Sequence, residues 1–244
     1  PEGMEPHEAE PTPQNLAFLT TADVLVYNGL DMEFYLKKTL ATIDNESLML
    51  VEASHGITPI KLADDDDGDK EEEEHHHKEG HHHHPGSIDP HAWLSPECAK
   101  VMVKNIQKAL STVDKKHKKA YAKNANAYIK KLDALITEYK TKFASLKNRQ
   151  LVASHAAFGY LCRDFGLEQS SIKDVFAEGE PNAKELITLV EYCKKNNIKT
   201  IFSEEVASTT LADTLAREIN GKIVKIYTME ISEDGMDYIS RMEE

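Results

Sequence analysis

Histidine and carboxylate side chains recur where a sheet protein would place its ligands. His155 ends the apolar stretch QLVASH, and Glu230 ends a second one, KIVKIYTME; both have the composition of buried strands. His91 and His7 lie in DPHAWLSP and MEPHEAEPTP, where proline stiffens the loop. Open parallel sheets bind ligands at the carboxyl ends of their strands. Three imidazole nitrogens and one carboxylate oxygen would suit a divalent transition metal.

A second group of histidines is crowded into HHHKEGHHHH, directly after an acidic run. The surrounding loop 64–88 has low complexity and no apolar periodicity, so we expect it to be mobile. Its position inside the chain argues against a purification tag. The alternatives are a low-affinity accessory metal site and a solvated acidic linker that binds metal incidentally. The histidines concerned are His75, His76, His77, His81, His82, His83 and His84.

Catalytic interpretations have less support. Glu204 and Glu205 follow the strand-like IKTIFS and could act as general acid and base. A three-histidine metal site with an open position could also activate water for hydrolysis. The sequence contains no HExxH, GxSxG, Walker A or GxGxxG motif. We therefore predict a protein that is not an enzyme, with a zinc-dependent hydrolase as the alternative.

The composition predicts a folded, acidic protein. The chain has 244 residues, 40% of them hydrophobic and 29% charged, and a formal net charge of −13. This balance argues against nucleic-acid binding and is compatible with a cationic ligand. No stretch approaches the ~20 apolar residues of a membrane span. Without CxxC spacing, Cys98, Cys162 and Cys193 are interpreted as small buried hydrophobes, although a Cys98–Cys162 pair stays open.

Apolar patterning predicts alternating strands and helices, which is typical of an α/β fold with parallel sheets. Strands are expected over 22–29, 47–54, 150–155, 198–205 and 222–230, and helices over 32–43, 95–113, 115–147, 157–166, 182–197 and 210–220. The helix over 115–147 would be about 45 Å long at 1.5 Å per residue, enough to join two lobes as a spine. We expect an N-terminal lobe over 1–113, a linking helix over 114–147 and a C-terminal lobe over 148–244.

Six segments, taken in order, resemble one known family. EPHEAEPTP, ADVLVYNGLDMEFYL, DPHAWLSP, VASHAAFGYL, EGEPNAKEL and YTMEISEDGMDYISRM are similar to segments of the metal-binding solute-binding proteins of ABC transporters, in the zinc-uptake branch. The resemblance spans nearly the whole chain, and DPHAWLSP and SHAAFGYL are its most specific parts. It implies two α/β lobes linked by a long rigid helix, with the metal held in the cleft between them.

The resemblance also implies the ligands. By motif they would be His7, His91 and His155, with Glu230 or water in fourth place, whereas Glu204 and Glu205 would lie near the cleft without binding. Compared with the family, the start of the first lobe before EPH is expected to be missing here, and the last helix is expected to be cut after Met242-Glu243-Glu244. We therefore expect the first lobe to lack its first strand and the second lobe to be shortened at its end.

The implied function is metal capture. The protein would be an extracytoplasmic monomer, either periplasmic or a cell-surface lipoprotein, that binds Zn²⁺ and delivers it to an ABC permease for import. Three nitrogen ligands favour zinc over Mn²⁺, which prefers carboxylate oxygen. A manganese-binding protein of the same family is the alternative.

Overall fold

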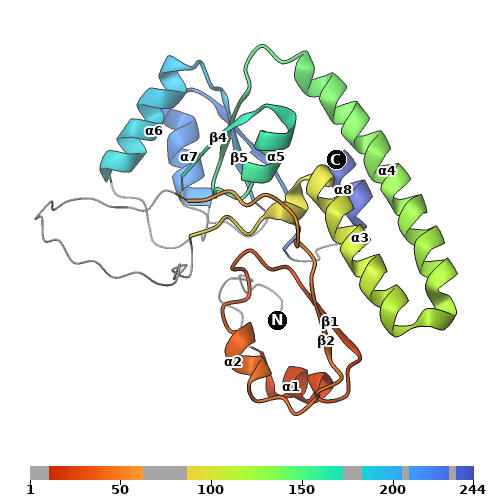
Figure 1. Cartoon of the computed structure of the whole chain (residues 1–244). Helices are drawn as coiled ribbons and strands as arrows, with labels where there is room; N and C mark the ends of the chain where they lie inside the picture. Colours follow the sequence, from red (N-terminus) through yellow and green to blue (C-terminus); the bar gives the residue numbers. More distant parts are fainter. Residues whose placement is uncertain (1–10, 63–86, 173–182, 205–208, 231–234) are drawn as a thin grey trace, which may run out of the picture.

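The computed structural model describes residues 11–62, 87–172, 183–204, 209–230 and 235–244, and it contains two parallel sheets (Figure 1). The smaller sheet pairs β1 (Val24–Tyr27) with β2 (Met49–Glu52). The larger sheet has the order β4-β3-β5-β6, with every neighbouring pair parallel. Its strands are β3 (Gln150–Ala153), β4 (Glu168–Ser171), β5 (Thr200–Ser203) and β6 (Lys222–Lys225). The predicted α/β fold class is confirmed.

Helices connect these strands and cover the sheets. Their bounds are α1 (Pro13–Leu19), α2 (Leu36–Leu40), α3 (Pro96–Val113), α4 (Lys118–Ala144), α5 (Gly159–Phe165), α6 (Ala183–Lys195), α7 (Thr209–Glu218) and α8 (Tyr238–Glu243). Among the described residues, no helix is both long and apolar enough to cross a membrane.

Both faces of the larger sheet are buried, and β3 shows why. Successive side chains of a strand point to opposite faces. Leu151 and Ala153 pack in one cluster with residues of α5, including Phe165, whereas Val152 packs in another with Leu215 of α7. A parallel sheet needs helices on both faces because its crossovers run there. The continuous apolar character of this strand therefore follows from its central place in the sheet.

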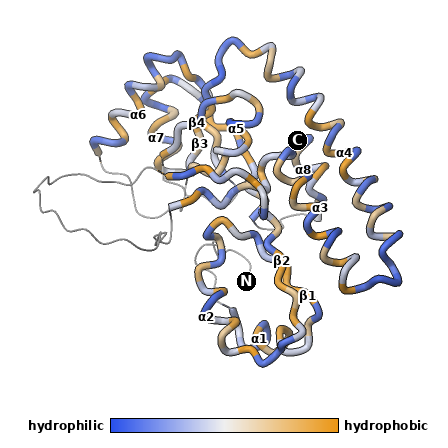
Figure 2. Tube along the Cα trace, in the orientation of Figure 1, coloured by the Kyte–Doolittle hydropathy of each residue, from blue (hydrophilic) through white to orange (hydrophobic). Residues whose placement is uncertain are grey.

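The long helix α4 joins the two halves of the molecule. It has 27 residues, or about 40 Å at 1.5 Å per residue, and it runs beside α3 back toward the larger sheet (Figure 1). Leu132 of α4 packs on Ala99 of α3, and Ile136 enters the cluster around β3. Hydrophobic and hydrophilic positions alternate along α4, as a helix with one buried stripe requires (Figure 2). The predicted spine helix is thus confirmed.

The start of α4 differs slightly from the prediction. Asp114 caps the turn, since its carboxylate accepts a hydrogen bond from the backbone N–H of His117 at 3.2 Å. The first residues after it, Lys115–His117, form a 3-10 turn, and the α-helix begins only at Lys118.

One strand was not predicted. The polar sequence of β4, EQSS, gives no apolar signal, because β4 lies at the edge of its sheet and is only partly buried. An edge strand keeps its place through hydrogen bonds to one neighbour, here β3, so the side chains need not be apolar.

The predicted helix over 32–43 is largely wrong. Only Leu36–Leu40 is helical. Leu30 and Asp31 take left-handed backbone angles, with φ of 54° and 61°. The carboxylate of Glu33 turns back to accept hydrogen bonds from the backbone N–H groups of Asn28 and Gly29. Residues 32–35, predicted to be helical, therefore belong to this turn and its continuation, and the helix begins only at Leu36.

The predicted strand over 222–230 is too long. Its paired part ends at Lys225, with one further hydrogen bond from Ile226 N to Ser203 O at 2.9 Å. The chain then leaves the sheet, and Met229 adopts a left-handed φ of 55°. This departure matters for function, because it carries Glu230 away from the strand end.

The three cysteines are free and buried, which confirms their interpretation as small core residues and excludes the Cys98–Cys162 pair in this structure.

Candidate metal centre

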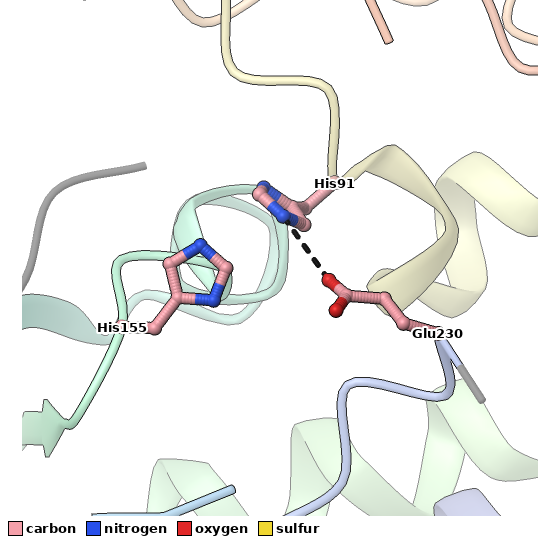
Figure 3. A group of neighbouring side chains, drawn as sticks. All are labelled: His91, His155 and Glu230. Atoms are coloured by element: carbon pink, nitrogen blue, oxygen red, sulfur yellow. Dashed lines mark ion pairs between the residues drawn. The ribbon is translucent and has the colours of Figure 1, made fainter. Parts of the chain in front are cut away.

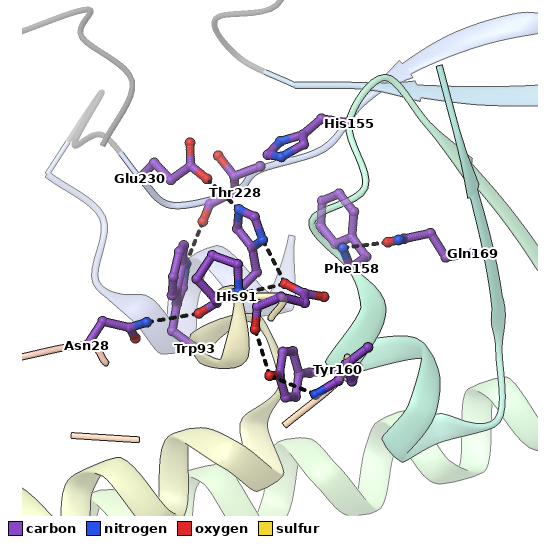
Figure 4. Close-up of polar contacts among 12 residues, drawn as sticks. Asn28, His91, Trp93, His155, Phe158, Tyr160, Gln169, Thr228 and Glu230 are labelled. Atoms are coloured by element: carbon purple, nitrogen blue, oxygen red, sulfur yellow. Dashed lines mark hydrogen bonds and ion pairs between the residues drawn. The ribbon is translucent and has the colours of Figure 1, made fainter. Parts of the chain in front are cut away.

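His91 is held in a fully buried position by the loop that precedes α3. Its side chain is 0% exposed. The Asp89 carboxylate accepts a hydrogen bond from the backbone N–H of His91 at 2.9 Å, and the same oxygen, Oδ1, lies 2.9 Å from the ring nitrogen Nδ1 (Figure 4). A carboxylate can only accept, so Nδ1 carries the proton. The other ring nitrogen, Nε2, of a neutral His91 then has its lone pair available for a metal.

Glu230 reaches this nitrogen from the opposite half of the molecule. Its Oε1 lies 3.4 Å from His91 Nε2 (Figure 3). The segment before Glu230 is fixed by Trp93, whose Nε1–H donates to the carbonyl oxygen of Thr228 at 2.8 Å. Trp93 lies two residues after His91, so one short turn both carries the imidazole and anchors the carboxylate segment.

His155 completes the group from the end of β3. It is 2% exposed, and its ring lies edge-on to the His91 ring with centroids 4.9 Å apart. Each of His91, His155 and Glu230 offers one ligand atom, and these three atoms lie within 4.8 Å of one another. Behind His155, Glu204 Oε2 lies 3.4 Å from Nδ1, and Glu204 Oε1 accepts a hydrogen bond from Ser154 Oγ at 3.1 Å.

The electrostatics of this group favour a cation. Three carboxylates, from Asp89, Glu204 and Glu230, surround two imidazoles in a buried place. Burial lowers the pKa of His91, but hydrogen bonds from its ring to the carboxylates of Asp89 and Glu230 outweigh burial and raise the pKa above the ordinary imidazole value. Carboxylates buried around imidazoles need a compensating positive charge. A divalent metal bound between the two rings and Glu230 would supply it.

The structure thus brings together three of the four residues predicted as ligands. His7 lies outside the described residues, as do Glu205 and the seven histidines between His75 and His84. Glu204 lies beside His155, close to the group but not part of it. The contact that sequence reasoning missed is the one between Asp89 and the His91 ring. The signal that could have found it is the spacing of the two residues in DPH.

Comparisons with known proteins show the family to which the chain belongs. The family model described as "Zinc-uptake complex component A periplasmic" matches residues 1–244. A "Putative metal-binding protein" of Treponema pallidum is 43% identical over 242 residues, covering 99% of this chain and 75% of that protein. The "High-affinity zinc uptake system protein ZnuA" of Bacillus subtilis is 37% identical over 249 residues, covering 100% and 76%.

Solved structures include similar folds. The crystal structure of the Zn(II)-bound ZnuA-like domain of Streptococcus pneumoniae AdcA matches with a TM-score of 0.77 and 35% identity, covering 99% of this chain and 84% of that one.

Proposed function

We propose that this chain, which belongs to the zinc-uptake complex component A family, is an extracytoplasmic protein that captures Zn²⁺ between its two lobes and delivers it to an ABC permease. The observation that carries the proposal is the buried group of His91, His155 and Glu230, whose ligand atoms lie within 4.8 Å of one another. The three residues come from separate segments of the chain, so the fold itself assembles the site.

The spacing of two ligand atoms supports zinc. Zinc bonds to nitrogen and oxygen are about 2.0–2.2 Å long, which places the ligands of a tetrahedral ion about 3.3–3.5 Å apart. His91 Nε2 and Glu230 Oε1 lie 3.4 Å apart. A zinc ion could therefore bridge them with little movement of either side chain.

The third histidine ligand, His7, is part of the proposal, as is Glu230 rather than water in fourth place. His7, in the proline-containing segment MEPHEAEPTP, would complete a site of three nitrogens and one oxygen. Zinc prefers such a mixed set, whereas manganese prefers carboxylate and other oxygen ligands. Manganese is the alternative cargo, and direct competition between the two ions distinguishes them.

Capture explains the site better than hydrolysis does. A catalytic zinc needs a position open to water and substrate, and both described imidazoles are almost completely buried. Reversible binding followed by release at a permease needs no such opening during transit. We place the protein on the outer side of the membrane, as a periplasmic protein or a lipoprotein, and expect it to act as a monomer.

Competition binding with a chromophoric chelator tests the proposal. The wild-type protein should hold one zinc ion tightly, and His91→Ala should lose that site. His55→Ala is the matched control, because His55 is an exposed histidine outside the metal group. Equal zinc affinity in the wild type and His91→Ala would overturn the proposed site.

The histidine-rich segment is proposed as an accessory, low-affinity site. Deleting residues 64–84 removes all seven of its histidines while leaving His7, His91, His155 and Glu230 in place. Calorimetry of the deletion variant should show one tight zinc site and fewer weak ones than in the wild type. Loss of the tight site would mean that the segment is the main binding site.

A further inference from the structure

We propose that Asp89 is a positioning residue for His91, and that Gly159 and Tyr160 of α5 hold Asp89 in place from the other lobe. This inference rests on the proposed function, since it concerns how the zinc ligand His91 is presented. Asp89 does not belong to the group of ligand atoms, and its carboxylate lies on the Nδ1 side of the ring, away from Glu230.

Asp89 is fixed through both its backbone and its side chain. It is 1% exposed. Its backbone N–H donates to the carbonyl oxygen of Ile60 at 3.0 Å, and its own carbonyl oxygen accepts from the Tyr160 hydroxyl at 2.7 Å. The same hydroxyl accepts from the backbone N–H of Ile60 at 3.2 Å, which closes a small ring of hydrogen bonds (Figure 4). Asp89 therefore has little freedom to rotate or to withdraw from His91.

The second carboxylate oxygen of Asp89 sits against a glycine. A Cβ added to Gly159 would lie 2.5 Å from Asp89 Oδ2, a distance that real side chains do not tolerate, and 3.3 Å from Ile60 Cδ1. Only glycine leaves the carboxylate room in its observed orientation. A methyl group here would push Oδ2 away and turn Oδ1 off the line to His91 Nδ1.

These contacts link the supports of the two imidazoles. Gly159 and Tyr160 begin α5, four and five residues after His155. Tyr160 also packs with Ile57 and Ala92, which lie on the His91 side of the molecule. The segment that carries His155 thus also holds the residue that orients His91. The separation of the two rings is then set by the protein, before a metal arrives.

A carboxylate bonded to one ring nitrogen changes the other. It fixes the ring orientation, keeps the proton on Nδ1, and makes Nε2 a stronger electron-pair donor. Removing such a partner commonly lowers metal affinity by about 10–100-fold. We therefore expect Asp89→Asn, which keeps the shape but removes the charge, to weaken zinc binding by roughly that factor.

The test compares Gly159→Ala, Asp89→Asn and their double mutant with the wild type, using zinc affinity, the visible absorption spectrum of the Co²⁺-loaded protein, and the melting temperature without metal. Gly221→Ala is the matched control, because its Cβ would also meet a close atom, Lys199 O at 2.8 Å, but far along the chain from Asp89. Co²⁺ absorption reports ligand geometry, which a merely looser fold would leave unchanged.

Four outcomes decide the matter. The positioning role is supported if Gly159→Ala and Asp89→Asn each weaken zinc binding by about 10–100-fold and alter the Co²⁺ spectrum. The double mutant should then bind zinc no more weakly than Asp89→Asn alone, and Gly221→Ala should bind zinc as the wild type does. Wild-type affinity and spectrum in both single variants would overturn the positioning role. If the losses of zinc affinity in the two single variants add up in the double mutant, Gly159 does not act through Asp89, and that part of the proposal is overturned. If the wild type itself binds no zinc tightly, the proposed function fails first.

Discussion

The two imidazoles of the metal group lie ring to ring, but the molecule holds them by different means. His155 lies two residues after β3, a central strand bonded on both sides, and the intervening Ser154 N–H still donates to Phe202 O of β5, so the sheet places it. His91 lies in a loop, and hydrogen bonds specific to that loop place it. Asp89 binds its backbone and ring, and Asn28 Nδ2 donates to the carbonyl oxygen of Pro90 at 2.9 Å.

This difference separates two ways of building a rigid site. A residue that follows a strand takes its position largely from the sheet; for His155, one local contact that adds to this is the 3.4 Å contact with Glu204. A residue in a loop must be fixed by its own contacts, so the loss of any one of them is enough to displace it. Changes around His91 should therefore disturb metal binding more than equivalent changes around His155.

The largest effect should come from removing either imidazole. Zinc sites with four protein ligands bind with about 10–16 kcal/mol, or about 3 kcal/mol for each ligand, so His91→Ala and His155→Ala should each cost at least about 100-fold in affinity. The metal-free proteins should differ. His91→Ala also leaves the buried Asp89 carboxylate without its ring partner, a loss of about 1–3 kcal/mol in unfolding free energy.

Thermal unfolding of the two metal-free variants measures that difference. His91→Ala should melt at a lower temperature than His155→Ala. Equal melting temperatures would mean that Asp89 contributes no more to its side of the site than Glu204 does.

Glu230→Gln should have the next largest effect. The substitution keeps the shape of the side chain but removes the negative charge that faces His91 Nε2. Interactions with a charged group contribute about 1.5–3 kcal/mol, so we expect zinc affinity to fall by about 10–100-fold. An unchanged affinity by competition titration would show that water, not Glu230, takes that ligand position.

Zinc affinity should also fall with acid. The pKa of His91 lies above its ordinary value, because hydrogen bonds to Asp89 and Glu230 outweigh burial. Zinc must displace the proton on Nε2. As the pH is lowered, zinc affinity should therefore start to fall while the pH is still above ~6.5, and then drop about tenfold per pH unit for each proton displaced. A decline that begins only well below that pH would contradict the raised pKa.

In the metal-free protein, the contribution of His91 to folding stability should change with pH in the opposite direction to zinc affinity. A raised pKa in the folded state means that protonated His91 stabilises the fold below the unfolded pKa, and that this contribution is lost as pH rises through the folded pKa. Melting curves without metal should therefore show His91→Ala losing more stability, relative to wild type, in acid than at neutral pH.

The smallest effect should come from Glu204→Gln. Its contact with His155 is 3.4 Å long, against 2.9 Å between Asp89 and His91. We expect less than about a tenfold loss of zinc affinity, below that of Asp89→Asn. A larger loss of zinc affinity in Glu204→Gln than in Asp89→Asn, measured in one titration series, would contradict the proposed difference between the His155 and His91 sides.

The sequence predicted the α/β fold, the spine helix and most elements, because buried strands and long amphipathic helices leave strong apolar patterns. It missed β4, since an edge strand of polar residues leaves none. It also extended the last strand to Glu230, whereas the chain leaves the sheet after Ile226. An apolar run cannot show where its neighbouring strand ends, and β5 ends at Ser203.

The site was predicted in part. His91, His155 and Glu230 could be chosen from residue type, loop position and family resemblance, and the structure brings them together. The Asp89–His91 contact has a signal in the spacing of DPH, but the support behind Asp89 could not be predicted, because it joins residues far apart in sequence, such as Asp89 and Tyr160. Nothing in the sequence near His91 shows that a glycine in another lobe leaves room for its partner.

The position of zinc in a crystal of the loaded protein, located by anomalous scattering at the zinc absorption edge, tests the proposed metal site most directly. We predict one strong peak about 2.0–2.2 Å from His91 Nε2, a ring nitrogen of His155 and a Glu230 oxygen. A strong peak bound only by the histidines of residues 75–84, with no zinc between His91 and His155, would contradict it.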